Sequence, residues 1–204
     1  AAALEAWRVP HAHLGADSFF ERETIVAMSA VLSAIEWPDD DLSVYATLKS
    51  PFVGITDADL LAYRTAVGPL RPLVPAGDVP PELALVASTL KLLRELHAAR
   101  HQRSIEASVR AFLERTLAEV SLALDEDGDA EARALGQLVS LARASDGRGE
   151  SFRDFVRWLA RRVDEPGLGS LDPAPDPEAV NVVSLLSVHK AKGLEFPVVI
   201  LACP

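Results

Sequence analysis

The sequence predicts an α/β protein with mainly helical content, in which a partial parallel sheet is interrupted by an all-helical insertion. Two apolar runs near the C-terminus, Val182–Val188 and Val198–Leu201, lack polar alternation and therefore suit strands that are buried on both faces of a parallel sheet. The N-terminal residues favour helix, short strand and helix, and about 125 residues with helical periodicity separate the two ends. An insertion within one sheet explains this order most simply.

The composition limits the class of protein. With 204 residues, 49% of them hydrophobic, the chain is able to bury a sizeable core, and its net charge of −10 argues against a surface that coats DNA generally. The single cysteine, Cys203, excludes an intramolecular disulfide and favours a cytoplasmic location. We find no run of 18 apolar residues and no secretory leader, so no membrane association is expected. The chain lacks an initiator methionine and stops three residues past a predicted strand, and we expect it to be a piece of a longer protein.

The charge is unevenly distributed along the chain. Lys91–Arg115 holds six basic residues against three glutamates, and Arg148–Arg162 holds five arginines against one glutamate and one aspartate. These segments are interpreted either as solvated helix faces or as a surface that follows phosphates. A salt-dependent affinity for nucleic acid distinguishes the two interpretations.

The first long helix is preceded by an aromatic pair. A short strand is predicted at His11–Leu14, whose two histidines lack a third metal ligand nearby. Phe19 and Phe20 are expected to pack in the core rather than to stack on bases. We expect Arg22 to tie the helix start to a neighbouring carboxylate. The apolar stripe of this helix is Ile25, Met28, Val31, Leu32 and Ile35.

Capping residues mark the next two helix starts. The acidic turn Pro38–Leu42 supplies an N-cap for a helix at Leu42–Lys49, and contiguous carboxylates there do not converge on a metal. The turn that starts at Ser50 ends this helix. Thr56 and Asp59 then have the spacing of a capping box, which predicts the start of another helix.

Four further amphipathic helices follow a proline-rich loop at Pro69–Pro81. His97 and His101 share one helix face, but the segment lacks the glutamate and the third ligand of a zinc site, so both are placed on the surface. The acidic stretch 125–131 does not fit a calcium loop and is interpreted as a charged turn. Asp164–Ala179, with four prolines, is interpreted as a linker. The helices are predicted at Glu82–His101, with Leu85, Leu92, Leu93 and Leu96 facing inward, and at Ile105–Leu124, Glu131–Arg143 and Phe152–Val163.

The residues with the clearest chemistry lie between the two C-terminal apolar runs. Open α/β sheets bind ligands in the loops that leave the carboxyl ends of their strands. The loop His189–Glu195 offers lysines as phosphate donors, a flexible glycine and one carboxylate. It therefore predicts a binding site at this edge of the sheet.

This stretch, SVHKAKGLEFPVVIL, resembles motif V of the UvrD-like superfamily I DNA helicases. His189 and the run Lys192–Phe196 keep every spacing of that motif. Lys190 and Pro197 favour the helicase–nuclease subunits of the AddA and RecB types. Ser187 stands where the family usually has threonine, and a hydroxyl is retained.

The resemblance implies the domain organisation. Residues 1–50 and 179–204 are expected to form part of the second RecA-like domain, called 2A, and residues 51–178 its helical insertion, called 2B. The family has a Gly-rich turn after Ser50 that approaches duplex phosphates through backbone N–H groups. In this chain Val53 replaces the family's arginine and Thr56 its second glycine, which weakens the expectation of close approach.

The resemblance also implies an activity for the full-length protein. It is expected to be an ATP-dependent DNA helicase of the 3′–5′ superfamily I type, acting in double-strand break repair and recombination, with a nuclease region beyond Pro204. Lys192, Gly193 and Glu195 are implied to contact ATP. Ser187 and His189 are implied to contact the single strand. The implied partners are Mg²⁺, single-stranded and duplex DNA, and a second subunit of a helicase–nuclease complex.

The chain itself contains no phosphate-binding loop of the form GxxxxGK followed by serine or threonine. Without that loop and its magnesium-binding partner we expect the isolated chain to hydrolyse no ATP. Two other classes stay open. One is a non-enzymatic module whose helices dock a partner subunit, and the other is a stand-alone α/β enzyme that acts on a small phosphorylated ligand.

Overall fold

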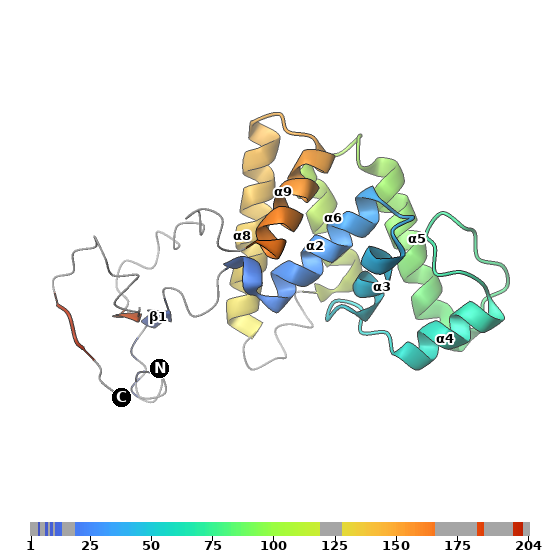
Figure 1. Ribbon diagram of the computed structural model, residues 1–204, viewed down its shortest axis with the longest axis horizontal. Helices are drawn as coiled ribbons and strands as arrows, with labels where there is room; N and C mark the ends of the chain where they lie inside the picture. Colours follow the sequence, from blue (N-terminus) through green and yellow to red (C-terminus); the bar gives the residue numbers. More distant parts are fainter. Residues whose placement is uncertain are drawn as a thin grey trace. The chain divides into compact units, whose positions relative to one another are not determined.

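The computed structural model describes residues 19–118, 128–165, 11–13, 183–185 and 198–201, together with Leu4, Trp7 and Val9 (Figure 1). The chain divides into two units: Ala1–Ser18 with Leu171–Pro204, and Phe19–Ser170.

The first unit contains a parallel pair of strands. Strand β1, His11–His13, pairs with β2, Val183–Leu185, in the register His11 to Val183 and His13 to Leu185. Both lie within the segments predicted as strands. Parallel pairing of segments so far apart in sequence requires the intervening chain to form a crossover.

The predicted strand at Val198–Leu201 is not found. These four residues have no regular secondary structure, and Val198 and Ile200 are 77% and 85% exposed. An apolar strand of this kind is stable only when neighbours pair with it and cover both of its faces. Among the described residues the sheet has two strands, so neither a RecA-like sheet nor the larger sheet of a stand-alone α/β enzyme is present there.

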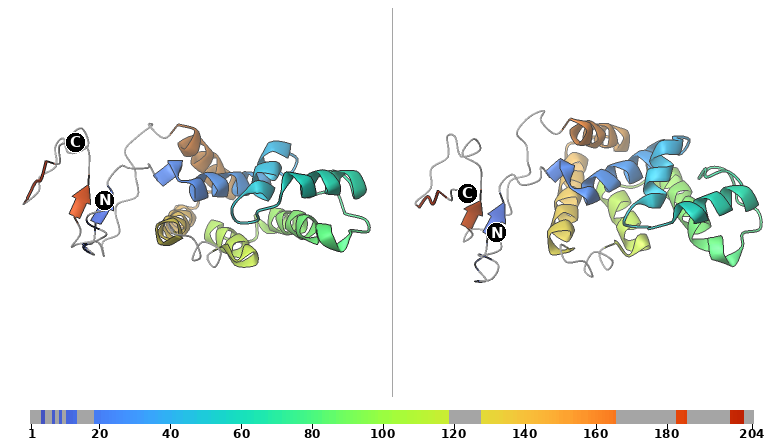
Figure 2. Two further views of the ribbon diagram at one scale, coloured as in Figure 1. Left: turned by 90° about the horizontal axis from the view of Figure 1, so that it is seen from below. Right: turned by 60° about the horizontal axis from the view of Figure 1, so that its bottom comes forward.

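The second unit is helical, and several of its helices pack around the buried apolar stripe of helix α2, Glu23–Glu36. Helix α2 packs against α3, α5, α8 and α9, and the views in Figures 1 and 2 show it passing between them. All five residues of the predicted stripe are completely buried. The other elements are η1 Phe19–Glu21, α3 Asp41–Lys49, α4 Asp57–Ala66, η2 Pro81–Leu83, α5 Ala84–Ala99, α6 Ile105–Thr116, α8 Gly128–Gly147 and α9 Phe152–Asp164.

The predicted caps are confirmed. The Asp40 carboxylate accepts from the Leu42 N–H at 3.1 Å at the start of α3. At the start of α4, Thr56 Oγ1 accepts from the Asp59 N–H at 3.2 Å and donates to the Asp59 carboxylate at 2.6 Å. Each cap satisfies a backbone donor that the first helical turn leaves free.

Three helix predictions differ from the structure. Helix α6 ends at Thr116 rather than Leu124, because Leu117 adopts a left-handed conformation (φ 53°) and its N–H closes the helix end on Leu113 and Glu114. Helix α8 begins at Gly128, so part of the predicted charged turn is helical. On α5, Leu85 was predicted to face inward but is 55% exposed, and Val86 is buried instead.

Among the described residues, no helix is long and apolar enough to cross a membrane.

Candidate nucleotide and nucleic-acid sites

The residues implied to bind ATP and the single strand follow strand β2. The loop that contains Ser187, His189, Lys192, Gly193 and Glu195 lies outside the described residues, so these assignments stay predictions. Strand β2 ends at Leu185, two residues before Ser187 in the sequence. Because β1 and β2 are parallel, the end of β2 at Leu185 is a carboxyl edge, which is where α/β sheets bind ligands.

The aromatic pair before α2 is structural, as predicted. Phe19 and Phe20 are 6% and 3% exposed, and the Phe20 ring meets Trp158 of α9 edge-to-face at 5.7 Å. Neither ring is free to stack on a base. Arg22 donates to the Glu131 carboxylate of α8 at 2.9 Å, and the Thr24 hydroxyl hydrogen-bonds to the same carboxylate. The predicted carboxylate partner of Arg22 is therefore found.

The turn after α3 uses three of its backbone donors internally. The N–H groups of Val53 and Gly54 donate to the Ser50 carbonyl at 3.0 and 2.8 Å, and that of Ile55 donates to Leu48 at 3.1 Å. Gly54 has a φ of 70°, which favours glycine. The Ile55 N–H caps α3 and the other two N–H groups close the turn, so these three donors are not available to phosphates in the way that the resemblance suggests for this turn.

The two histidines of α5 differ from each other. His101 is exposed, as predicted, but His97 is partly buried, and its Nδ1 is 2.7 Å from the Ile35 carbonyl oxygen. The surface prediction for His97 was wrong, because helix periodicity does not show which side of a helix another helix covers. Among the described residues no group of three or more potential ligands is placed to hold a metal ion.

A buried carboxylate joins three helices at the end of α2. Glu36 has a completely buried side chain, and its two oxygens accept from Arg100 Nε at 3.1 Å and from Arg153 Nε at 2.6 Å. The two arginines come from the end of α5 and the start of α9. Sequence reasoning missed this cluster, although a glutamate directly after the stripe residue Ile35 was an indication of it.

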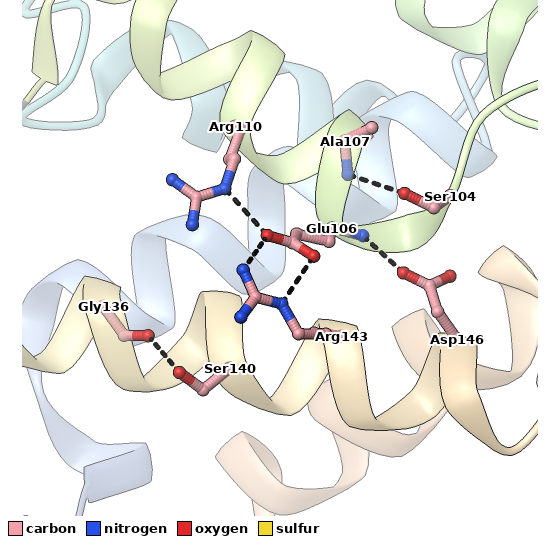
Figure 3. A network of polar contacts seen from close by, with 8 residues as sticks. All are labelled: Ser104, Glu106, Ala107, Arg110, Gly136, Ser140, Arg143 and Asp146. Atoms are coloured by element: carbon pink, nitrogen blue, oxygen red, sulfur yellow. Dashed lines mark hydrogen bonds and ion pairs between the residues drawn. The ribbon is translucent and has the colours of Figure 1, made fainter.

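A second charged network joins α6 to α8 (Figure 3). The Glu106 carboxylate accepts two bonds from Arg143, at 2.7 and 2.9 Å, and one from Arg110 at 2.9 Å. The Asp146 carboxylate accepts from the backbone N–H groups of Ile105 and Glu106 at 2.7 and 3.0 Å. Hydrogen bonds from Arg143 and then Arg110 lower the pKa of Glu106 from 4.5 to about 2.

The Glu106 network predicts a pH-dependent stability. Because the pKa of Glu106 is lower in the folded chain, its stabilisation is present above pH 4.5 and is lost as the pH falls towards about 2. A Glu106→Gln variant should unfold at a lower temperature than the parent at pH 6, with the gap closing between pH 4.5 and 2. Thermal unfolding followed by circular dichroism measures this gap. Glu114→Gln, an exposed change on the same helix, is the control, and a gap that is constant with pH would contradict the prediction.

One cavity of the helical unit is lined by a basic helix. Its volume is about 410 Å³, and the described residues that line it come from α9: Asp154, Arg157, Trp158, Arg161 and Arg162. Trp158 is partly exposed there and stacks on Phe155 at 5.7 Å. This helix carries four arginines and two aspartates within a chain of net charge −10. The cavity is therefore suited to an anion.

Comparison with known proteins agrees with the family that the motif V resemblance predicts. No family model matches the chain. The chain is 32% identical over 192 residues, 90% of its length, to the AddA-type subunit of the ATP-dependent helicase/nuclease of Desulforudis audaxviator. It is 30% identical over 91% of its length to the protein of the same name from Carboxydothermus hydrogenoformans, and 26% over 96% to that from Lactobacillus delbrueckii subsp. bulgaricus.

The chain is a homologue of a segment of the AddA-type helicase/nuclease subunits. The resemblance predicted from the loop after β2 is confirmed. The chain spans only 15 to 16% of the length of these AddA relatives. Because the alignment covers nine-tenths of the chain, most of the helical unit of α2 to α9 belongs to the homologous segment.

Proposed function

We propose that the chain is the part of an ATP-dependent DNA helicase that carries motif V and a helical insertion. The observation that supports this most is the intact motif spacing from His189 to Phe196, in a chain 32% identical to a helicase/nuclease subunit over 90% of its length. The full-length protein would act in double-strand break repair and recombination. It would move along single-stranded DNA with 3′–5′ polarity, beside a partner subunit.

In this proposal the loop after β2 contacts both ligands. Lys192 and the Gly193 N–H complement the triphosphate charge, and Glu195 accepts from the ribose hydroxyls. Ser187 and His189 hold phosphates of the single strand without reading its sequence. ATP and Mg²⁺ would be bound mainly by parts of the protein outside this chain. Since one short loop touches both ligands, closing the nucleotide cleft would shift the DNA, which is a coupling of two binding free energies.

The helical unit fits the role of the insertion. We predicted that the insertion covers residues 51–178, between the two RecA-like segments 1–50 and 179–204. The division of the chain at Phe19 and Ser170 supports an insertion that starts earlier, with η1 and α2 as its first elements. The parallel pairing of β1 and β2 is consistent with one sheet that is resumed after the insertion.

The proposal is tested in the full-length protein with Lys192→Ala. Removing a charge that contacts the triphosphate should lower DNA-stimulated ATP turnover by about 100-fold or more. Lys91→Ala, a change at an exposed lysine on α5, should leave turnover unchanged. Turnover that is equal in both variants would contradict the assignment. In the same assay the isolated chain should hydrolyse no ATP. A Mg²⁺-dependent ATPase activity that copurifies with the isolated chain would contradict this expectation.

Exposed apolar side chains favour the alternative in which the isolated chain only docks a partner. Leu61 of α4 and Leu85 of α5 are 67% and 55% exposed. Capture of the partner subunit of a helicase–nuclease complex on the immobilised chain, unaffected by added DNA, would support this alternative. Loss of capture in Leu61→Ser with Leu85→Ser would locate the contact.

A further inference from the structure

The basic face of α9 contains two arginines whose side chains pair with no other group among the described residues. Arg153, at its start, is paired with buried Glu36, and the Arg162 guanidinium lies over the Phe20 ring at 5.9 Å from its centre. Arg157 and Arg161 are exposed, and neither side chain has a hydrogen bond or an ion pair within the part of the chain that the structure describes. Both line the cavity of about 410 Å³.

The geometry of these two arginines favours an anionic polymer as the ligand. They are four residues apart, so their attachment points lie on one face and about 6 Å apart along the helix. Like charges at this spacing destabilise a helix by about 0.2–0.5 kcal/mol unless a counter-charge lies between them. The helix dipole favours Arg161 and Arg162 in the last turn, but it does not account for Arg157.

The walls of the cavity are held in place. Trp158 packs between Phe20 and Phe155, which fixes its indole as an apolar wall beside the arginines. The Ser151 hydroxyl binds Asp154 at 2.6 Å, so this carboxylate is engaged at the helix start. The guanidinium groups are thus presented from a rigid helix. Planar guanidinium groups match phosphate oxygens in geometry and charge.

We infer that the α9 face of Arg157, Trp158, Arg161 and Arg162 binds the phosphate backbone of nucleic acid. Phosphates two steps apart on one strand of a duplex are separated by about 7 Å along its axis, close to the spacing of Arg157 and Arg161. This inference rests on the proposed function, in which the full-length protein acts on DNA. It assigns to α9 a contact with nucleic-acid phosphates, in a chain whose turn after α3 uses the N–H groups of Val53, Gly54 and Ile55 internally.

The test measures binding of the 204-residue chain to fluorescein-labelled single-stranded and duplex oligonucleotides by anisotropy. Arg157→Ala with Arg161→Ala should weaken binding about 10-fold or more at low salt and reduce the slope of log affinity against log salt by about 2. The matched control is Arg64→Ala with Arg103→Ala. Those residues are also exposed and without an ion-pair partner among the described residues, and the control removes the same charge. Its affinity should stay within about 2-fold of the parent.

The outcomes separate this inference from the proposed function. Equal losses in both double variants, or no binding by the parent chain, would overturn the inference. So would a polyglutamate peptide that competes as well as the oligonucleotide, because the site would then select any acidic polymer. A preference for duplex or for single strand identifies which backbone is bound. Repeating the pair of variants with His189→Ala keeps the effect of α9 apart from that of motif V, whose own test is ATP turnover in Lys192→Ala.

Discussion

The double substitution Arg100→Met with Arg153→Met should lower the free energy of unfolding by about 3–5 kcal/mol. It removes both counter-charges from Glu36, whose side chain is completely buried between α2, α5 and α9. A carboxylate left alone in this environment has neither water nor a donor to replace the two guanidinium groups. Urea unfolding of the chain, followed by circular dichroism, measures the change.

A third substitution makes the test specific. Adding Glu36→Met to the double variant should recover most of the lost stability, because an apolar replacement of a buried ion cluster is often neutral or stabilising. Arg64→Met with Arg103→Met, two exposed changes, should cost less than about 1 kcal/mol in total. If the triple variant is no more stable than the double, the loss comes from packing and the electrostatic explanation is wrong.

Phe155→Ala is expected to destabilise the helical unit by about 3–5 kcal/mol. The Phe155 ring is completely buried on the inner face of α9 and stacks on Trp158 with an angle of 27° between the ring planes. Removing the ring leaves a cavity next to Trp158, which lines the basic face of α9. Urea unfolding gives the stability, and Leu61→Ala, at a residue that is 67% exposed, is the control.

The same variant also has a local readout. In a background with Trp7→Phe and Trp37→Phe, the emission of Trp158 should shift to longer wavelength when Phe155 is lost, because the indole gains contact with water. Unchanged emission together with unchanged stability would show that α9 packs on α2 without this ring.

The sequence predicted the features that depend on near neighbours. The stripe of α2 and the caps at Asp40 and Thr56 follow from spacings of a few residues, and all are found. Pairing across helices was not predictable in this way. Glu36 meets partners 64 and 117 residues away, and nothing in the local pattern identifies them.

The helix ends show the same division between local and distant causes. The end of α6 depends on one left-handed residue, Leu117, of a type that rarely adopts that conformation. For the candidate sites, the family and the loop after β2 followed from a single motif. The basic segment Arg148–Arg162 was recognised, but only the fold separates Arg153, which is paired with Glu36, from Arg157 and Arg161.

The first and last elements of the helical unit, η1 and α9, pack against each other through Phe20 and Trp158. The first and last described elements of this unit therefore lie side by side, as in a domain that is inserted at one point of another fold. A body attached in this manner can be lengthened, shortened or exchanged for another during evolution while the register of β1 with β2 is kept. A protein engineer has the same freedom, and the unit boundaries at Phe19 and Ser170 mark the segment to exchange.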